Sequence, residues 1–153
     1  MKRNEALVPL SHDHHQGLII AQLMSKNAPL YSTLPNTPGE RRRYVVEKFR
    51  SELKPHFENE ENLLFPFVKG FSSKLDLLIE DILEEHVVLV GNFERLAVAE
   101  DFIDLMHETG VLLNNHIRTE ERELFELIQS NVPSEILDKL NGTIPAAGGR
   151  CEI

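Results

Sequence analysis

Apolar residues recur along this chain at helical rather than strand spacing, and proline and glycine divide the pattern into segments. The pattern predicts helices at about residues 11–27, 40–69, 73–98, 101–129 and 134–140. Ser11 and Asp101 are candidate N-caps, and Pro55 is expected to kink the second helix just before His56. We therefore predict an all-α fold in which the four long helices form an up-down-up-down four-helix bundle, followed by a short C-terminal helix.

Length and composition are those of one globular domain. The chain has 153 residues, of which 41% are hydrophobic and 27% charged. We assign residues 1–141 to the bundle and expect residues 142–153, a Gly-rich stretch, to form a flexible tail. The single cysteine, Cys151, lies in this tail, which excludes an internal disulfide framework.

The charge and hydropathy of the chain argue against two classes of partner. A net charge of −9 does not suit the phosphate backbone of nucleic acids, and the triplet of residues 41–43 is a short arginine run expected on a solvated helix start. No apolar run reaches the roughly 18 residues of a membrane-spanning helix, and the N-terminus lacks a signal-peptide core. We expect a cytoplasmic protein that binds neither nucleic acid nor membrane.

A ten-residue pattern occurs twice, in the second and the fourth predicted helix. Residues 56–65 and 116–125 both read H-x-x-x-E-E-x-x-L-F. Four residues advance a helix by about 400°, so the histidine and the first glutamate of each copy lie one turn apart on one face. This spacing suits two ligands of one metal ion, or one ligand and one bridge of a metal pair. The other two long helices share a weaker echo that begins at His15 and at His86.

The ordinary interpretation of a single His-x-x-x-Glu is a surface ion pair. It leaves the repetition unexplained, and inward carboxylates are unfavourable unless they are paired or coordinate a metal. The second glutamates of the repeats, Glu61 and Glu121, lie about 100° off the shared face. We expect them to be solvated or to contact a neighbouring helix rather than to bind metal.

Six residues resemble, in order and spacing, the metal ligands of the hemerythrin-like (HHE cation-binding) family: His15, His56, Glu60, His86, His116 and Glu120. The resemblance covers nearly the whole chain. It implies four helices around two iron ions, bridged by two carboxylates and an oxo or hydroxo group. Glu60 and Glu120 would be the bridges. His15 and His56 would bind one iron, and His86 and His116 the other.

The first helix offers three histidines that cannot all face inward. His14 and His15 diverge by about 100°, whereas His12 and His15 share a face. The residues after His15 resemble those after the first ligand of the family, which favours His15. His14 and His12 stay open as alternatives, and His12 could also be an outer partner or an additional ligand.

One departure from the family bears on function. Oxygen-carrying hemerythrins place a second histidine four residues along the third helix, where this chain has Val90. An open coordination position is therefore expected, and reactive chemistry is favoured over reversible oxygen carriage. The donor types also suit manganese or zinc.

The resulting hypothesis is a non-haem di-iron protein that binds or senses dioxygen, nitric oxide, peroxide or iron, rather than a conventional enzyme. One alternative is an enzyme that consumes peroxide or nitric oxide at the open position. The other alternative is a metal-free helical module that binds a partner protein.

Overall fold

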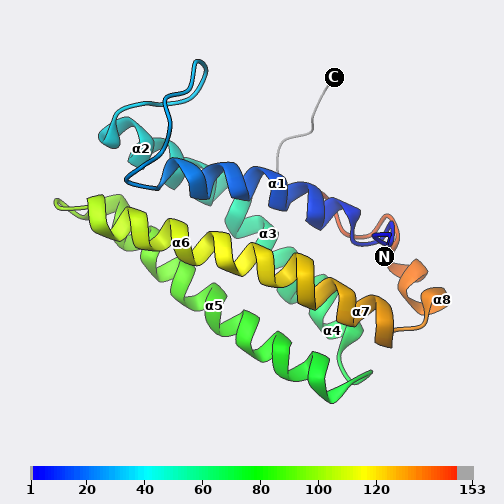
Figure 1. Ribbon diagram of the computed structural model, residues 1–153. Coiled ribbons are helices and arrows are strands. Elements are labelled where there is room, and N and C mark those ends of the chain that lie inside the picture. The colour runs from blue at the N-terminus through cyan, green and yellow to red at the C-terminus, as the bar shows by residue number, and fades with distance from the viewer. Residues whose placement is uncertain (1, 148–153) are drawn as a thin grey trace.

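Helices make up most of the structure, a computed structural model that describes residues 2–147 (Figure 1). The described residues contain no strand, in agreement with the predicted all-α class. Residues 38–68 and 103–131 are helical throughout, and we call them the second rod and the fourth rod. The α-helices are α1 (Val8–Leu23), α2 (Pro38–Lys48), α3 (Lys54–Asn59), α4 (Phe65–Val68), α5 (Ser73–Val98), α6 (Ile103–Thr119), α7 (Phe125–Asn131) and α8 (Ser134–Leu137). The other helical segments are the π-helices η1 (Phe49–Leu53), η2 (Glu60–Leu64) and η3 (Glu120–Leu124) and the 3₁₀-helix η4 (Asp138–Leu140).

Two helices begin where the sequence provides a side-chain cap. The hydroxyl of Thr37 accepts the backbone N–H of Glu40 at the start of α2, and the hydroxyl of Ser72 accepts that of Leu75 at the start of α5. These contacts satisfy N–H groups that the first turn of a helix leaves unpaired. The bounds of α5 agree with the predicted residues 73–98.

The first and the last long helix begin elsewhere than predicted. Ser11 is not an N-cap, because α1 begins one turn earlier at Val8 and the Ser11 hydroxyl donates to Glu121 instead. Asp101 is not an N-cap either, because α6 follows Phe102 and has no side-chain cap. Both expectations rested on residue type, and neither side chain reaches an unpaired N–H of the first turn.

Small residues let α1 and α6 run side by side (Figure 1). A Cβ atom added to Gly17 would lie 2.7 Å from Cδ1 of Ile117. One added to Gly110 would lie 2.7 Å from Cβ of Met24 and 2.9 Å from the carbonyl oxygen of Ala21. Atoms do not approach a Cβ so closely, so Gly110, which faces a backbone carbonyl and a Cβ atom, sets the distance between the helices. At Gly17 only the flexible end of the Ile117 side chain would have to move.

Two hydrophobic clusters fill the interior of the molecule. The first cluster includes Leu10, Leu64, Ile82 and Leu124. The second cluster includes Ile20, Phe57, Leu89 and Ile117. Both clusters draw on α1, α5 and the two rods, and in each of these the sequence between the two sets contains buried histidine or glutamate. A polar layer therefore separates the two parts of the core.

Residues 142–147, expected in a flexible tail, pack against the helices. Ile144 is buried in the first cluster. The carbonyl of Pro145 accepts a hydrogen bond from Asn59, and the N–H of Ala147 donates to the carboxylate of Asp13. The surrounding glycines concealed this apolar anchor in the sequence. The rest of the tail, with Cys151, lies outside the described residues.

The arginines at the start of the second rod are held by carbonyl groups. Arg41, expected to be solvated, is buried, and its guanidinium donates to the carbonyls of Pro29 and Pro35. Arg42 donates to the carbonyl of Ala99 beyond the end of α5. These bonds tie the proline-rich linker and α5 to α2.

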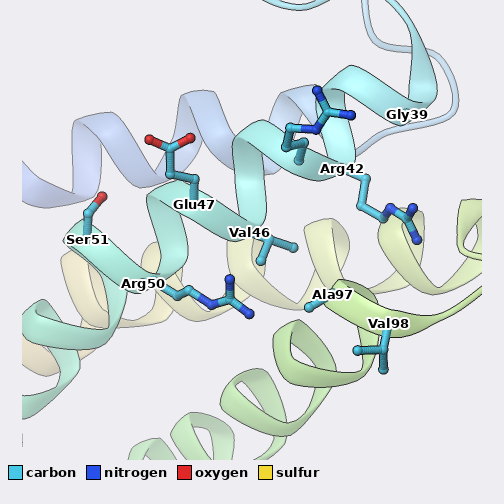
Figure 2. Close-up of a pocket in the computed structure, with 9 residues that line it drawn as sticks. Gly39, Arg42, Val46, Glu47, Arg50, Ser51, Ala97 and Val98 are labelled. Carbon is cyan, nitrogen blue, oxygen red and sulfur yellow. The ribbon is translucent and has the colours of Figure 1, made fainter.

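A groove of about 780 Å³ lies between α2 and the end of α5 (Figure 2). Its walls include Arg42, Arg50, Val46 and Val98, and none of its lining residues belongs to the polar layer. Among residues 2–147, no helix combines the length and apolar character needed to cross a lipid bilayer.

Candidate metal centre

Six buried polar side chains meet in the layer between the hydrophobic clusters. They are His14, His56, Glu60, His86, His116 and Glu120, each at most 2% exposed. They form two groups of four in which one ligand atom of each residue lies within 4.8 Å of the others. The first group contains His14 and His56, the second contains His86 and His116, and both groups contain Glu60 and Glu120.

The inward nitrogen of every histidine is Nε2. Nε2 of His14 and Nε2 of His56 lie 3.1 Å apart. Oε1 of Glu60 lies 3.3 Å from Nε2 of His56 and 3.2 Å from Nε2 of His86. Oε1 of Glu120 lies 3.4 Å from Nε2 of His14 and 3.2 Å from Nε2 of His116. Adjacent donors of one octahedral ion with bonds of about 2.1 Å lie about 3.0 Å apart, so these separations suit a shared coordination sphere.

The layer contains buried polar atoms that the protein leaves unsatisfied. Among the described residues, both carboxylate oxygens of Glu60, both of Glu120 and Nε2 of His86 and His116 have no hydrogen-bond partner. Buried polar atoms in folded proteins nearly always have a partner, and each exception requires a cause. Metal ions supply one, because they bond to all of these atoms. The donor set therefore fits metal ions.

A second carboxylate faces the outward nitrogen, Nδ1, of each histidine. The pairs are His14 with Glu121 at 3.2 Å, His56 with Asp13 at 3.0 Å, His86 with Glu61 at 2.8 Å and His116 with Glu85 at 2.7 Å. A carboxylate at Nδ1 holds the proton on that nitrogen, leaves Nε2 free to bind a metal and fixes the ring orientation. Hydrogen bonds at Nδ1 thus prepare His56, His86 and His116 as Nε2 ligands. Nδ1 of His14 faces Glu121 without the geometry of a hydrogen bond.

The glutamates change the protonation of the layer. Burial alone lowers the pKa of His56, but the charge of Glu60 and the hydrogen bond with Asp13 outweigh burial and raise this pKa to about 10. Burial likewise opposes protonation of His116, yet Glu120 raises the pKa of that histidine to about 10. The pKa of Glu120 lies well below its usual value because His116 outweighs burial. The layer strongly favours bound positive charge.

The comparison with protein families follows this geometry. The family model described as Hemerythrin HHE cation binding domain matches residues 6–128. The chain belongs to the hemerythrin HHE cation-binding family. A relative named DNA nickase, from Nostoc sp. (strain PCC 7120 / SAG 25.82 / UTEX 2576), is 27% identical over 104 residues. The match covers 65% of this chain and 29% of that relative, so the chain spans less than a third of the relative's length. No solved structure matches the chain.

Each glutamate that the two groups share begins a π-helical turn in this hemerythrin-family chain. Glu60 opens η2 and Glu120 opens η3. The N–H of Phe65 donates to the carbonyl of Glu60, and the N–H of Phe125 donates to that of Glu120, so each turn holds one residue more than an α-helical turn. The repeated sequence therefore forms a repeated backbone irregularity, of a kind that is frequent at functional sites.

Proline does not account for both of these turns. Pro55 follows η1 and Pro66 follows η2, and a wider turn accommodates a proline ring that an α-helix would not. Where a kink was expected before His56, the second rod contains the π-helical turn η1. η3 has no proline after it, which points to the metal-ligand repeat itself as the common cause.

The contacts repeat along with the sequence. Asp13 precedes His14 and faces His56, and in the same way Glu85 precedes His86 and faces His116. Likewise, the second glutamate of each repeat faces the buried histidine of α5 or of α1: Glu61 faces His86, and Glu121 faces His14. The centre of this hemerythrin-family chain is thus built twice, from an acidic residue and a histidine on one helix and His-x-x-x-Glu-Glu on the other.

The structure corrects the residue favoured on the first helix. His15 is exposed and lines a surface groove between α1 and α6, whereas His14 is buried in the layer. The inward face of α1 is set by Gly17 and Ala21, which are three and seven residues from His14 and pack against α6. The structure brings the other five predicted residues together.

Two of the outer carboxylates were not predicted to face a histidine. Asp13 gave no signal on its own, and Glu85 was expected only to be exposed. The other two, Glu61 and Glu121, contact a neighbouring helix as expected. A usable signal was present, because an acidic residue precedes the histidine in both Asp13-His14 and Glu85-His86. Aligning the two helices on that dipeptide identifies His14 instead of His15.

The remaining candidate positions, two histidines and the valine on the third long helix, lie outside the centre. His12 belongs to neither group of four and is only partly buried. His107 accepts the backbone N–H of Lys26 at the surface. Val90 is partly buried against the second hydrophobic cluster. Its side chain has no atom that can bind a metal ion, so it adds no donor to the centre.

Proposed function

We propose that this chain is a non-haem di-iron protein that binds or senses dioxygen, nitric oxide or peroxide. The helices would form the up-down-up-down four-helix bundle of the family, with His14 and His56 on one iron and His86 and His116 on the other. Glu60 and Glu120 would bridge the two ions. The observation that carries the proposal is the pair of four-residue groups that share both glutamates.

The choice of iron rests on donor type and number. Four imidazoles and two shared carboxylates give each position two neutral nitrogens and two oxygens. Imidazole and carboxylate suit iron, and they also suit manganese and zinc, so metal analysis has to compare all three. Separations of 3.1–3.4 Å between neighbouring donors suit tetrahedral as well as six-coordinate ions, so the preference for iron comes from the family's di-iron pattern and not from these distances.

The surrounding side chains serve small ligands. A pair of iron ions would supply redox chemistry and open positions for diatomic ligands or peroxide. Phe57 stacks on His86 with ring centroids 4.2 Å apart, and Phe125 stacks on His14 at 5.5 Å. These rings give the layer apolar walls beside two of its histidines, which would favour small, weakly polar ligands. The bridging and outer carboxylates hold the imidazole rings in place.

Metal analysis tests the proposal. The protein is purified without an affinity tag, loaded anaerobically with Fe²⁺, desalted and analysed for iron, manganese and zinc. We expect about two iron ions per chain and, after exposure to air, near-ultraviolet absorption of an oxo-bridged ferric pair. The control is the double variant Glu60→Gln, Glu120→Gln. A stoichiometry well below one ion per chain, unchanged in the control, would refute the proposal.

A second candidate function is consumption of peroxide or nitric oxide. It is favoured by Val90, because two histidines and two shared glutamates leave positions on a six-coordinate ion without a protein donor. Turnover of hydrogen peroxide by the iron-loaded chain, compared with an equal concentration of free iron, tests this candidate. Rates equal to those of free iron would eliminate it.

A further inference from the structure

We propose that the two metal positions differ in lability: the ion at His86 and His116 exchanges with solvent through a groove between α5 and α6, whereas the ion at His14 and His56 is retained. This inference rests on the proposed di-metal centre. It concerns residues outside the ligand set, since the inner ligands of the two positions are equivalent. Glu85 is assigned as the positioning residue of the exchangeable position.

The outer carboxylates of the first position are held by further contacts, and they are less exposed than those of the second, with 26% exposure for the side chain of Glu121. The side chain of Asp13 is 4% exposed, and its Oδ2 accepts the N–H of Ala147 as well as facing His56. Glu121 accepts hydrogen bonds from the guanidinium of Arg3 and from the hydroxyl of Ser11. Segments from both ends of the chain therefore cover this side of the centre and keep its carboxylates in place.

The outer carboxylates of the second position lack such support. The side chain of Glu61 is 41% exposed and that of Glu85 is 42% exposed. Within residues 2–147, each makes no hydrogen bond or ion pair other than the one with its histidine. Either carboxylate can turn into water without breaking a second contact. The histidine that it orients is then free to rotate.

A groove leads from solvent to the second position. It has a volume of about 420 Å³, lies between α5 and α6, and is lined in part by His116 itself. Glu85 lies in the same wall beside His116, and Asp81 and Glu84 add two further carboxylates. Carboxylates that line a groove raise the local concentration of cations and speed their arrival. The groove thus offers metal ions from solvent a route past these carboxylates to the histidine that would bind them.

Release kinetics test the inference. Chain loaded with two Fe²⁺ is mixed anaerobically with excess chromogenic ferrous chelator, and absorbance is followed over time. We expect two phases of equal amplitude. Changing Glu85→Gln should speed the fast phase by about tenfold or more and leave the slow phase unchanged, because loss of an outer carboxylate weakens metal binding by about 10–100-fold. Glu121→Gln should speed the slow phase instead, and Glu123→Gln, an exposed neighbour without such a contact, should change neither.

A steric block tests the route separately. Leu112 and Val111 are adjacent, exposed residues of α6 that line different grooves. Leu112→Trp should fill the α5–α6 groove and slow the fast phase several-fold, with stoichiometry kept at two. Val111→Trp introduces the same side chain, with at least as much added bulk, into the groove between α1 and α6 and should leave both phases unchanged.

The outcomes separate this inference from the proposed function. A chain that binds no metal refutes the proposed function before any kinetics are measured. Two ions that leave in a single phase, or a fast phase that responds to Glu121→Gln and not to Glu85→Gln, overturn the inference and leave the di-metal centre intact. Equal slowing by Leu112→Trp and Val111→Trp overturns the route.

Discussion

The two halves of the polar layer have the same chemistry and different surroundings. In the half around His14 and His56, the outer carboxylates are shielded, and Ala147 and Arg3 from the two ends of the chain hold them. In the half around His86 and His116, the side chains of the corresponding carboxylates are 41% and 42% exposed. The internal repeat determines which atoms face the centre. The chain ends, which have no counterpart in the repeat, determine how well each half is covered.

The largest effect is expected from changing the two glutamates that both halves share, because each change acts on both halves. Because both groups of donors share Glu60 and Glu120, Glu60→Gln and Glu120→Gln should each reduce bound iron to below one ion per chain. The thermal stabilisation of about 2.7 kcal/mol expected from metal at 100 times its dissociation constant should disappear with it. Elemental analysis and thermal unfolding with and without Fe²⁺ measure both. Retention of two ions by either variant would contradict the shared-bridge geometry.

Variants of two adjacent histidines on α1 test the enclosed half without changing the other half. His14→Ala should remove the ion of the enclosed half, so that about one ion per chain remains and only the fast release phase is seen. His15→Ala changes a neighbouring exposed residue and should retain both ions and both phases. If His15→Ala lost an ion and His14→Ala did not, the orientation of α1 would be wrong.

The C-terminal segment is expected to contribute stability as well as cover. Ile144→Ala removes a buried side chain from the first hydrophobic cluster and should lower the free energy of unfolding of the metal-free chain by about 2–4 kcal/mol. In the loaded protein it should also speed the slow release phase, because Ala147 would hold Asp13 less firmly. Urea denaturation checks the first effect. A change within 0.5 kcal/mol, about the size of an ordinary surface substitution, would mean that the segment is not anchored there.

The smallest expected effect is a difference in stability between two conservative variants, one in each half. Asp13→Asn should destabilise the metal-free chain by about 1–3 kcal/mol, because a buried carboxylate with two contacts is lost. Glu85→Gln should change its stability by less than about 0.5 kcal/mol, because that carboxylate is half in water. Urea denaturation of both metal-free variants measures the difference. Equal losses would show that the two halves are enclosed alike.

The sequence predicted most of the centre because its signal is periodic. The repeated His-x-x-x-Glu placed His56, Glu60, His116 and Glu120 on inward faces, and His86 followed from its position on the remaining long helix. The choice among the first-helix histidines failed for a physical reason. The buried face of α1 contains Gly17, a residue with no hydrophobic signal that is buried because α6 approaches so closely.

Other features were not accessible from sequence. The π-helical turns at Glu60 and Glu120 have α-like backbone angles at their ends, and the residues that they share, two glutamates and a leucine, are ordinary helix formers. The packing of Ile144 depends on a surface assembled from distant parts of the chain. The exposure of Glu85 depends on which segments happen to cover α5.

The extra residue in each π-helical turn has a consequence for how the chain can vary. One residue of an α-helix corresponds to about 100° of rotation, so in a regular α-helix the five residues from Glu60 to Phe65 would place the two side chains roughly 140° apart. The wider π-helical turn absorbs the extra residue, and Phe65 and Phe125 are both buried. Deleting a single residue from either turn would return it to a four-residue step of about 400°, which keeps the aromatic ring on nearly the same side of the helix, so these two stretches can lose one residue more readily than a regular α-helix can.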